Sequence, residues 1–410
     1  MKIGTVKGTS DYLPNEVILR EFIQNSILET YKINGFERIM TPAIEDIENL
    51  DKSDGGDNLN LIFKILKRGE KLNSAIENAQ FNELSDMGLR YDLTLPLSRY
   101  FANNRQNLTL PFKCIQIDKV YRAERPQKGR MRELVQCDID IIGSDSVYCE
   151  IELINVTAKA LLAIGLKNFK VRINDRNILR NILLSIGFKQ DELESVCITF
   201  DKLDKIGING IKAELSEKGA SEESINALSS ILRKLPLSLD YIKSISSQKD
   251  SINNLQEIIN KITLLSENKY TIEFDLSLVR GQGYYTGTVF EIESSDFNSS
   301  IAGGGRYDNL IGKFLNEKIP AVGFSIGFER IFHILKDNRF YIPNARKKIA
   351  VFFENNFLEA NKKADKLRND YDVTLFEKPK KLSKFLNSLL EMGFYGFFVY
   401  GQSEEIKILN

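Results

Sequence analysis

Arginines gather in one short segment of the chain, residues 121–133. This segment holds four arginines and one lysine against two glutamates. The planar guanidinium group matches the oxygens of a phosphate, and an arginine at the end of a paired strand would be held ready to bind one. Basic loops are also common as solvated hairpin tips. Charge alone favours the solvated tip, so the phosphate interpretation depends on other segments.

Three further segments combine glycines with arginine, tyrosine or carboxylate side chains: residues 278–291, 302–308 and 321–330. Glycine lets a backbone approach a ligand closely, or supplies a positive φ. The adjacent Tyr284 and Tyr285 would point to opposite faces of a strand, so that one of them faces a pocket. Taken singly, each segment is typical of a structural glycine-rich turn. No P-loop motif and no dinucleotide-binding glycine motif after a strand is present.

The elements that must position these segments follow from apolar periodicity. Residues 112–122 and 133–142 predict two strands of a long antiparallel hairpin around the basic loop. Residues 321–327 predict a strand leading into a helix, with Arg330 near the helix start. Earlier in the chain, the pattern predicts helices at residues 16–33 and 97–102 and strands at residues 36–42, 57–72 (closing as a hairpin at Gly69) and 90–95.

In the rest of the chain, the predicted type of secondary structure changes twice. Residues 149–163 and nearly all of 174–265 have helical periodicity, and strands return at 270–278 and 287–293. Residues 347–410 alternate strand, helix, strand, helix and strand, which is typical of a parallel or mixed sheet in a small separate domain. We therefore expect an α/β (α+β) fold in three parts. These are residues 1–173 with 266–336, a helical insertion at 174–265, and a C-terminal domain at 346–410.

Composition excludes several classes of function. The 56 basic and 56 acidic residues give no net charge, so any contact with nucleic acid must come from local patches. Four cysteines without a C-x-x-C pair predict reduced thiols. His333 is the one histidine and lies in an apolar helical run, which favours a structural role over zinc or triad chemistry. No apolar run is long enough for a membrane span or a secretory signal, so we expect a cytoplasmic protein.

The order of the segments is more specific than any one of them. An Arg-x-Glu hairpin, Arg122-Ala123-Glu124, follows a strand that ends at Pro42. An Arg-Gly-x-x-Tyr-Tyr-Thr segment, a Gly-Gly-Arg-Tyr-Asp turn and a Gly-x-Glu-Arg helix come after it. From Lys7 to its end, the chain resembles the class II aminoacyl-tRNA synthetases and, within them, the histidyl-tRNA synthetase family. The resemblance implies an antiparallel-sheet catalytic domain, and it makes the C-terminal part a short anticodon-binding-like domain.

The resemblance implies an ATP site built mainly from arginines. Arg122 matches the hairpin arginine on the α-phosphate, and Glu124 matches the glutamate that contacts adenine. Arg330 matches the arginine on adenine and the γ-phosphate. Arg280 matches the family's own arginine, placed against the α-phosphate opposite Arg122. These two arginines are the implied catalytic residues, because carboxylate attack at phosphorus builds negative charge that fixed cations stabilise. Mg²⁺ would neutralise the remaining phosphates.

The resemblance also implies a histidine site and contacts with tRNA. Asp92 and Thr94 match the amino-group site, and Asp140 with Tyr285 matches the pair that holds the imidazole. Asp140 alternates with apolar residues, so it is also compatible with the plain polar face of a strand. The full set of matched side chains is Asp92, Thr94, Arg130, Gln136, Asp140, Tyr284 and Tyr285 for histidine, and Gln127 and Arg132 for the tRNA acceptor end.

The sequence departs from the family pattern in three places. Leu134 stands where phenylalanine usually stacks on adenine, Val135 replaces a residue that is often aromatic or histidine, and Gln282-Gly283 stands where Leu-Asp is common. The C-terminal part ends before the final elements of many relatives. Its basic residues are compatible with phosphate contacts or with a solvated helix face; they are Lys378, Lys380, Lys381 and Lys384.

The resemblance implies L-histidine, ATP and tRNA-His as partners, and a homodimer whose interface includes residues 16–42. Two other classes of protein share parts of the pattern. One is a regulatory paralogue that binds histidine and activates ATP phosphoribosyltransferase without charging tRNA. The other is a non-catalytic RNA-binding module. The presence of Arg122, Arg280, Arg330 and a C-terminal domain favours the enzyme.

Overall fold

The computed structural model describes residues 3–52, 61–125, 131–280, 284–403 and 405–409. Two compact units form. One contains residues 1–11 and 23–335, and the other contains residues 12–22 and 336–410. Within the described residues, no helix is long and apolar enough to span a membrane.

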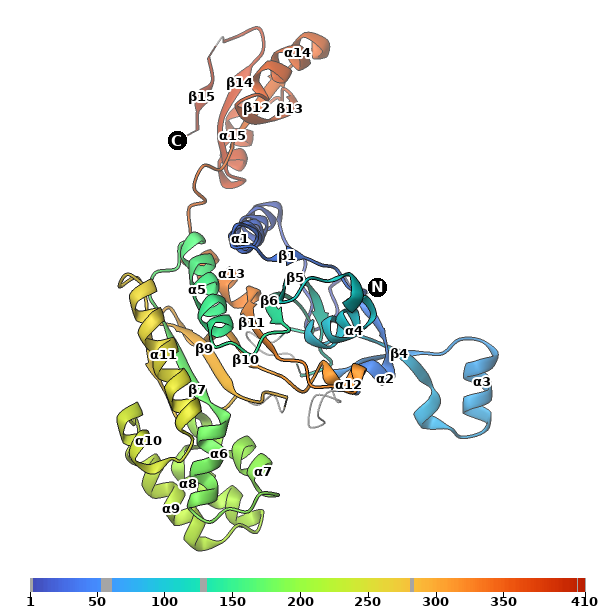
Figure 1. The fold of residues 1–410 in the computed structure, drawn as a ribbon. Helices are drawn as coiled ribbons and strands as arrows, with labels where there is room; N and C mark the ends of the chain where they lie inside the picture. The colour runs from blue at the N-terminus through green and yellow to red at the C-terminus, as the bar shows by residue number, and fades with distance from the viewer. Residues whose placement is uncertain (1–2, 53–60, 126–130, 281–283, 404, 410) are drawn as a thin grey trace. The chain divides into compact units, whose positions relative to one another are not determined.

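The larger unit is organised around an eight-stranded sheet (Figure 1). Its six middle strands pair antiparallel, and one parallel pair lies at each edge. The predicted long hairpin is confirmed as β5 and β6, the second and third strands of the sheet. In spatial order the strands are β1 (Glu37–Arg38), β5 (Phe112–Tyr121), β6 (Glu133–Ile142), β11 (Ala321–Gly327), β10 (Phe297–Arg306), β9 (Thr288–Ser294), β7 (Phe169–Asp175) and β8 (Thr271–Phe274).

Helices flank this sheet, and four of them, α1, α4, α5 and α13, confirm predictions from periodicity. Helix α5 is apolar on nearly all sides and packs against β6, β11 and α11 (Lys249–Leu265). Helix α13 follows β11 directly, as predicted, and brings Arg330 into its first turn. The bounds are α1 (Pro14–Ile33), α4 (Thr94–Asn104), η3 (Arg105–Asn107), α5 (Tyr148–Ala163), α12 (Gly312–Leu315) and α13 (Phe328–Asp337).

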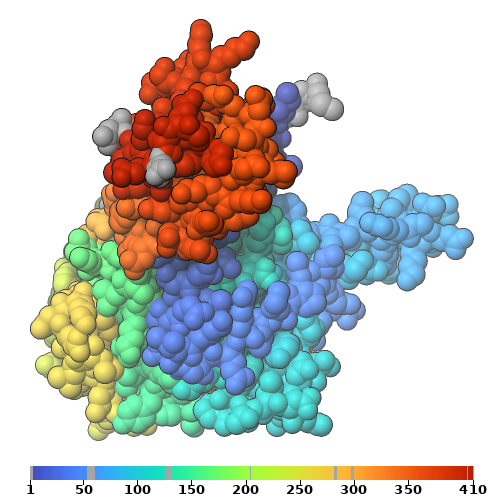
Figure 2. Space-filling view, turned by 90° about the horizontal axis from the view of Figure 1, so that it is seen from above, coloured from blue at the N-terminus to red at the C-terminus, as the bar shows by residue number. Residues whose placement is uncertain are grey.

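A three-stranded sheet with α3 extends away from the large sheet (Figure 1) and stands out from the surface (Figure 2). The prediction of a hairpin closing at Gly69 is wrong. Gly69 has a φ of 59° and precedes α3, so the chain turns into a helix there. The elements are β2 (Ile44–Asp46), α2 (Ile47–Leu50), β3 (Phe63–Leu66), α3 (Glu70–Glu77), η2 (Phe81–Glu83) and β4 (Ser85–Leu89).

The predicted strand at residues 90–95 is also wrong. Strand β4 ends at Leu89, and the Asp92 Oδ1 accepts a hydrogen bond from the Leu95 amide, 3.2 Å away, at the start of α4. Arg90 is buried and donates from Nε to the Lys119 carbonyl at 2.9 Å. These side-chain contacts hold the segment in place without a strand ladder, and they aim Asp92 inward.

Six helices lie between β7 and β8, which confirms the helical periodicity of residues 174–265. Serine side chains begin two of them: Ser221 caps α9 and Ser238 caps α10. The helices are α6 (Arg176–Ser185), α7 (Leu193–Phe200), α8 (Leu203–Glu217), α9 (Glu222–Leu232), α10 (Leu239–Ile245) and α11 (Lys249–Leu265).

The C-terminal residues form a separate mixed sheet, as predicted. Strands β13, β12 and β14 pair in parallel, and β15 adds an antiparallel edge. Helix α15 covers a phenylalanine-rich cluster on one face, and α14 packs on the other. The bounds are β12 (Lys347–Phe353), α14 (Phe357–Leu367), β13 (Tyr371–Glu377), α15 (Leu382–Glu391), β14 (Phe394–Val399) and β15 (Lys407–Ile408).

Candidate active site

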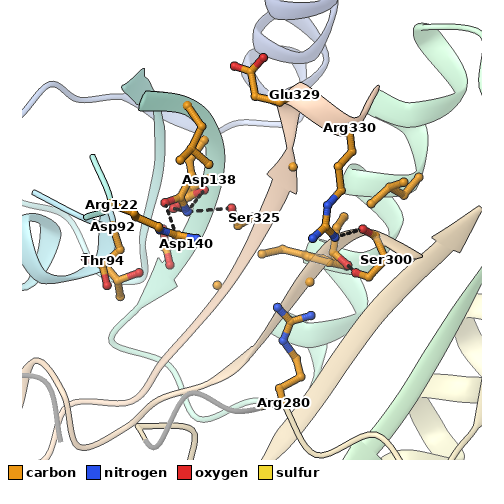
Figure 3. A pocket seen from close by; sticks show the side chains of 18 of the residues that line it. Asp92, Thr94, Arg122, Asp138, Asp140, Arg280, Ser300, Ser325, Glu329 and Arg330 are labelled. Carbon is orange, nitrogen blue, oxygen red and sulfur yellow. Dashed lines mark hydrogen bonds between the residues drawn. The ribbon is translucent and has the colours of Figure 1, made fainter. Parts of the chain in front are cut away.

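A cavity of about 370 Å³ opens over β6, β10 and β11. Carboxylates line one side of it, and Arg280 and Arg330 line the other (Figure 3). Ten of the side chains matched from sequence meet there, although they come from segments up to 238 positions apart, from residue 92 to residue 330. They are Asp92, Thr94, Arg122, Glu124, Gln136, Asp140, Arg280, Tyr284, Tyr285 and Arg330.

Three buried carboxylates form what we call the acidic cluster: Asp92, Asp138 and Asp140. Each is 5% exposed or less. Asp138 and Asp140 lie two positions apart on β6, so they share one face of the strand. The Tyr307 hydroxyl donates to Asp140 Oδ1 at 2.6 Å. Asp140 is therefore part of the cavity and not merely the polar face of a strand.

Burial raises the pKa of each carboxyl in the acidic cluster. The pKa of Asp92 rises to about 6, against an opposing effect of the Leu95 amide and Arg122. The pKa of Asp140 rises to about 7, although the Tyr307 hydrogen bond opposes the shift. Burial, together with the negative charge of Asp140, raises the pKa of Asp138 well above its ordinary value. The cluster is therefore ready to receive a cationic ligand, which would restore the ionised forms.

A chain of hydrogen bonds fixes Arg122 beside the acidic cluster. Its Nε donates to the Tyr91 carbonyl at 3.0 Å, and its Nη2 donates to Gln136 Oε1 at 3.2 Å. The Gln136 amide in turn donates to Ser325 Oγ at 3.1 Å. Because β6 and β11 pair in register, these polar side chains occupy fixed positions on neighbouring strands.

Arg280 enters the cavity from an irregular segment on the opposite side. Its φ is 55°, which costs a non-glycine residue about 1 kcal/mol. Its Nη1 donates to Glu291 Oε2 on β9 at 3.0 Å. The guanidinium lies directly over Gly303, where a Cβ would overlap it. A glycine is thus required at position 303 for Arg280 to take this place.

The glycine run at residues 303–305 was predicted to be a turn, and that prediction is wrong. It lies near the C-terminal end of β10 and pairs on both sides, with β9 and β11. A Cβ on Gly304 would overlap the Gly323 carbonyl, and one on Gly323 would overlap Asp140 Oδ1. The missing side chains make room for charged groups and for close packing of the strands.

Tyr284 and Tyr285 do not lie on a strand, so they do not point to opposite faces. Strand β9 begins only at Thr288. Both tyrosines are buried, line the cavity and contact each other edge to face, with ring centroids 4.8 Å apart. The ring of Tyr307 lies 6.0 Å from that of Tyr284. Three tyrosines therefore stand next to the acidic cluster.

The first turn of α13 completes the cavity. Arg330 Nη1 donates to the Ser300 carbonyl on β10. The neighbouring Glu329 accepts a hydrogen bond from the Val135 amide at 3.2 Å, which ties α13 to β6. Leu134, the departure from the family's usual phenylalanine, also lines the cavity. His333 is half-buried about one turn further along α13 and does not line the cavity, and the four cysteines, all within the described residues, are buried and form no disulfide.

Among the described residues, one matched side chain, Arg132, does not line the cavity. Arg132 donates from Nε to the Glu124 carbonyl at 3.2 Å, near the end of the hairpin. Gln127 and Arg130 lie outside the described residues. Sequence reasoning missed Asp138, Tyr307 and Ser325 as site residues. Two of these carried a signal: Asp138 alternates with Asp140 on one strand, and Tyr307 lies two positions after the glycine run.

These features define the class of protein. An antiparallel-centred sheet that presents a hairpin arginine and a helix-start arginine around one cavity is the catalytic fold of a class II aminoacyl-tRNA synthetase. Residues 8–331 match the sequence model of the histidyl-tRNA synthetase family. The chain therefore belongs to the histidyl-tRNA synthetase family.

Individual relatives agree with this family. The chain is similar to a histidine–tRNA ligase of Leifsonia xyli subsp. xyli, with 42% identity over 80% of this chain and 79% of the relative. The crystal structure of histidyl-tRNA synthetase from Nostoc sp. PCC 7120 matches with a TM-score of 0.79 and 26% identity, covering 97% of this chain and 91% of that one. An ATP phosphoribosyltransferase regulatory subunit/histidyl-tRNA synthetase from Bacillus halodurans C, 21% identical over 97% of this chain and 98% of that one with a TM-score of 0.78, shares the fold.

Proposed function

We propose that this protein activates L-histidine with ATP to histidyl-adenylate and transfers the histidyl group to the 3′ end of tRNA-His. One observation carries the proposal. A single cavity places three buried carboxylates on one side and two arginines on the other, with Arg122 at the acidic cluster. Such a cavity suits a ligand with cationic groups at one end and phosphates at the other.

The arginines would bind ATP and stabilise the transition state. The histidine carboxylate attacks the α-phosphorus, an acyl C–O–P bond forms, and the bond from the α-phosphorus to pyrophosphate breaks. Arg122 and Arg280 approach the cavity from opposite sides and would flank the α-phosphate, where charge develops. Arg330 would contact adenine and the γ-phosphate, and Glu124 the adenine. Leu134 can pack on the base but lacks the stacking preference of an aromatic ring.

The acidic cluster and the tyrosines would bind histidine. We assign the ammonium group to Asp92 and Thr94, and the carboxylate to Gln136 together with Arg130. We assign the imidazole to Asp140, Tyr284 and Tyr285. Two observations support the assignment of Asp140. Its side chain is buried, and the Tyr307 hydroxyl fixes its orientation while occupying only one of its two carboxylate oxygens.

Contacts with tRNA would involve the hairpin and the C-terminal domain. We assign Gln127 and Arg132 to the acceptor end. Residues 346–410 would form the anticodon-binding-like domain, residues 174–265 the helical insertion, and residues 1–173 with 266–336 the catalytic domain. Lys380, Lys381 and Lys384 are exposed near the start of α15, where they can reach phosphates.

Further partners follow from the same proposal. We propose that Mg²⁺ enters with ATP, since this ion is usually held through substrate phosphates and few carboxylates. Within the described residues no group of three potential ligands could hold a metal ion, and we assign it no side chain. We propose a homodimer in the cytoplasm. Large apolar side chains exposed between α1 and β2 support an interface there; they are Ile33, Met40 and Ile44.

The test is histidine-dependent exchange of pyrophosphate into ATP, followed by charging of tRNA-His transcript. The proposed enzyme gives both, and omission of histidine is the control for each reaction. Binding of histidine without exchange would instead support a regulatory paralogue of ATP phosphoribosyltransferase. Exchange without charging would preserve the activation step and locate the failure in the tRNA contacts.

A further inference from the structure

Residues 174–177, where β7 ends and α6 begins, hold the segment that carries Arg280 and the two tyrosines. We call this segment, in its described residues 276–280 and 284–287, the Arg280 segment. The Asn174 side-chain amide, at the end of β7, donates to the carbonyls of Leu276 and Leu278 at 3.1 and 2.9 Å. Asn174 is fully buried, so these hydrogen bonds are made away from water. The first part of the segment is thereby fixed.

The next residues of this stretch hold the other part of the segment. Arg176 is 4% exposed, and its Nη1 donates to the Tyr285 carbonyl at 3.1 Å. Its backbone amide donates to the Gly287 carbonyl at 3.1 Å. The Asn177 side chain donates to the Thr286 carbonyl at 3.2 Å. Three consecutive carbonyls of the Arg280 segment therefore depend on the start of α6.

The Arg280 segment is also held near its two ends, where the Leu278 amide donates to the Asp275 carbonyl at 3.1 Å and the Thr286 amide donates to the Arg306 carbonyl at 2.8 Å. Its described residues form no strand or helix, and Arg280 has a left-handed φ. Without a ladder, the position of each tyrosine ring follows from where its own carbonyl is held. Side-chain donors at the start of α6 replace the ladder, and Arg176 holds the residue whose ring lies against Tyr284.

Arg176 also contacts helix α7. Its Nη2 lies 3.9 Å from Glu194 Oε1 on α7, and Cys197 on the same helix is a further hydrogen-bond partner. A buried guanidinium on a neutral carbonyl needs a negative partner nearby, and Glu194 supplies it. The same carboxylate lies 3.6 Å from Arg180, one turn further along α6.

We infer that Arg176 is a positioning residue: it sets the place of the Tyr285 ring in the cavity and ties that place to helix α7 of the helical region. Its activity readout rests on the proposed function. Loss of the guanidinium would release the Tyr285 carbonyl and let both tyrosines drift from the acidic cluster. Histidine recognition would suffer. The ATP side would keep its geometry, because Arg122 and Arg330 lie on other elements and Arg280 lies beside the part of the segment that Asn174 holds.

The experiment compares Arg176→Met and Arg176→Lys with Arg180→Met in the full-length protein. Arg180 is the matched control, because it shares the helix and Glu194 but donates no hydrogen bond to the Arg280 segment among those of the described residues. In pyrophosphate exchange, Arg176→Met should raise the KM for histidine about tenfold or more, with the KM for ATP within about twofold of wild type. Arg176→Lys should recover part of the loss, and Arg180→Met should stay within about twofold.

A second measurement does not depend on activity. Hydrogen–deuterium exchange of peptides covering residues 276–287 should speed up in Arg176→Met and stay unchanged in Arg180→Met, at equal melting temperatures. Equal behaviour of the two methionine variants in both measurements would overturn the inference. Equal loss for histidine, ATP and melting temperature would also overturn it, since it would show a merely structural role. If wild type lacks exchange activity, the proposed function fails and hydrogen exchange alone decides the inference.

Discussion

The two sides of the cavity are built in different ways. On one side, Asp138 and Asp140 stand on β6, whose backbone is paired on both edges by β5 and β11. On the other, Arg280 leaves an irregular segment whose carbonyls are held by side chains from α6. The first arrangement fixes charge to the sheet. The second places a cation where no strand could carry it, at the cost of a strained φ and of dependence on remote residues.

The strongest test of the comparison removes the cation. Arg280→Ala should reduce pyrophosphate exchange by about a thousandfold or more, because the transition state loses a fixed positive charge. The melting temperature should fall little, since the side chain makes one ion pair, with Glu291. Arg346→Ala, on an exposed arginine of the C-terminal sheet, is the control. Near-normal exchange in the Arg280 variant would contradict its catalytic role.

On the acidic side, two carboxyls on one strand should behave differently. Asp140→Asn should raise the KM for histidine about 30- to 100-fold, the loss expected for a charge-assisted hydrogen bond. Asp138→Asn should change it less than about fivefold, because burial raises the pKa of Asp138 well above its ordinary value and so favours the neutral form, which an asparagine side chain resembles. Steady-state exchange kinetics at pH 7 measure both. A reversed order would mean that Asp138 carries the recognition.

The smallest expected effect is one of pH. The pKa of Asp92 is about 6 in the folded protein, so its carboxylate becomes protonated as the pH falls through 6 and loses its attraction for an ammonium group. The KM for histidine should rise about tenfold per unit below that pH. Asp92→Asn should give a high KM that no longer varies there. A flat wild-type profile between pH 5 and 7 would remove Asp92 from the ammonium site.

The same carboxyl gives a check on stability. Its folded pKa lies above its ordinary value of 3.8, so the folded protein keeps a proton that the unfolded chain releases between pH 3.8 and about 6. Its contribution to the free energy of unfolding therefore falls as the pH rises through that window. Histidine would reverse this sign by pairing with the ionised form. Added histidine should consequently raise the melting temperature more at pH 8 than at pH 5.5.

The regular side of the site could be predicted from the sequence because local periodicity determines it. The hairpin of β5 and β6, the strand β11 and the start of α13 all follow from apolar patterns within a few residues. These elements place Arg122, Gln136, Asp140 and Arg330. The alternation of polar and apolar residues on β6 also indicated that Asp138 shares a face with Asp140. The burial of Asp138 depends on pairing with β11, which comes much later in the sequence.

The irregular side could not be predicted in the same way. Gly303 lies in a strand because β9 and β11 pair with it on both sides and because Arg280 fills the space above it. Its own sequence predicts a turn. Tyr284 and Tyr285 share one cavity because carbonyls near them bind to α6, about a hundred positions earlier in the chain. The misassigned strand at residues 90–95 has the same cause, since Arg90 is held by distant carbonyls.

Glycines at and beside this cavity shape it through the side chains that they lack. At Gly303, Gly304 and Gly323, any other amino acid would bring a methylene or methyl group onto Arg280, a neighbouring strand or Asp140. A substitution at Gly303 or Gly323 would therefore place added volume against side chains that line the cavity, whereas one at Gly304 would disturb the pairing of β10 with β11. Gly4, with no atom within 4 Å of an added Cβ, has no such restriction. We therefore expect a substitution at Gly303 to displace the Arg280 guanidinium and to have an effect similar to that of Arg280→Ala, although glycine itself carries no reactive group.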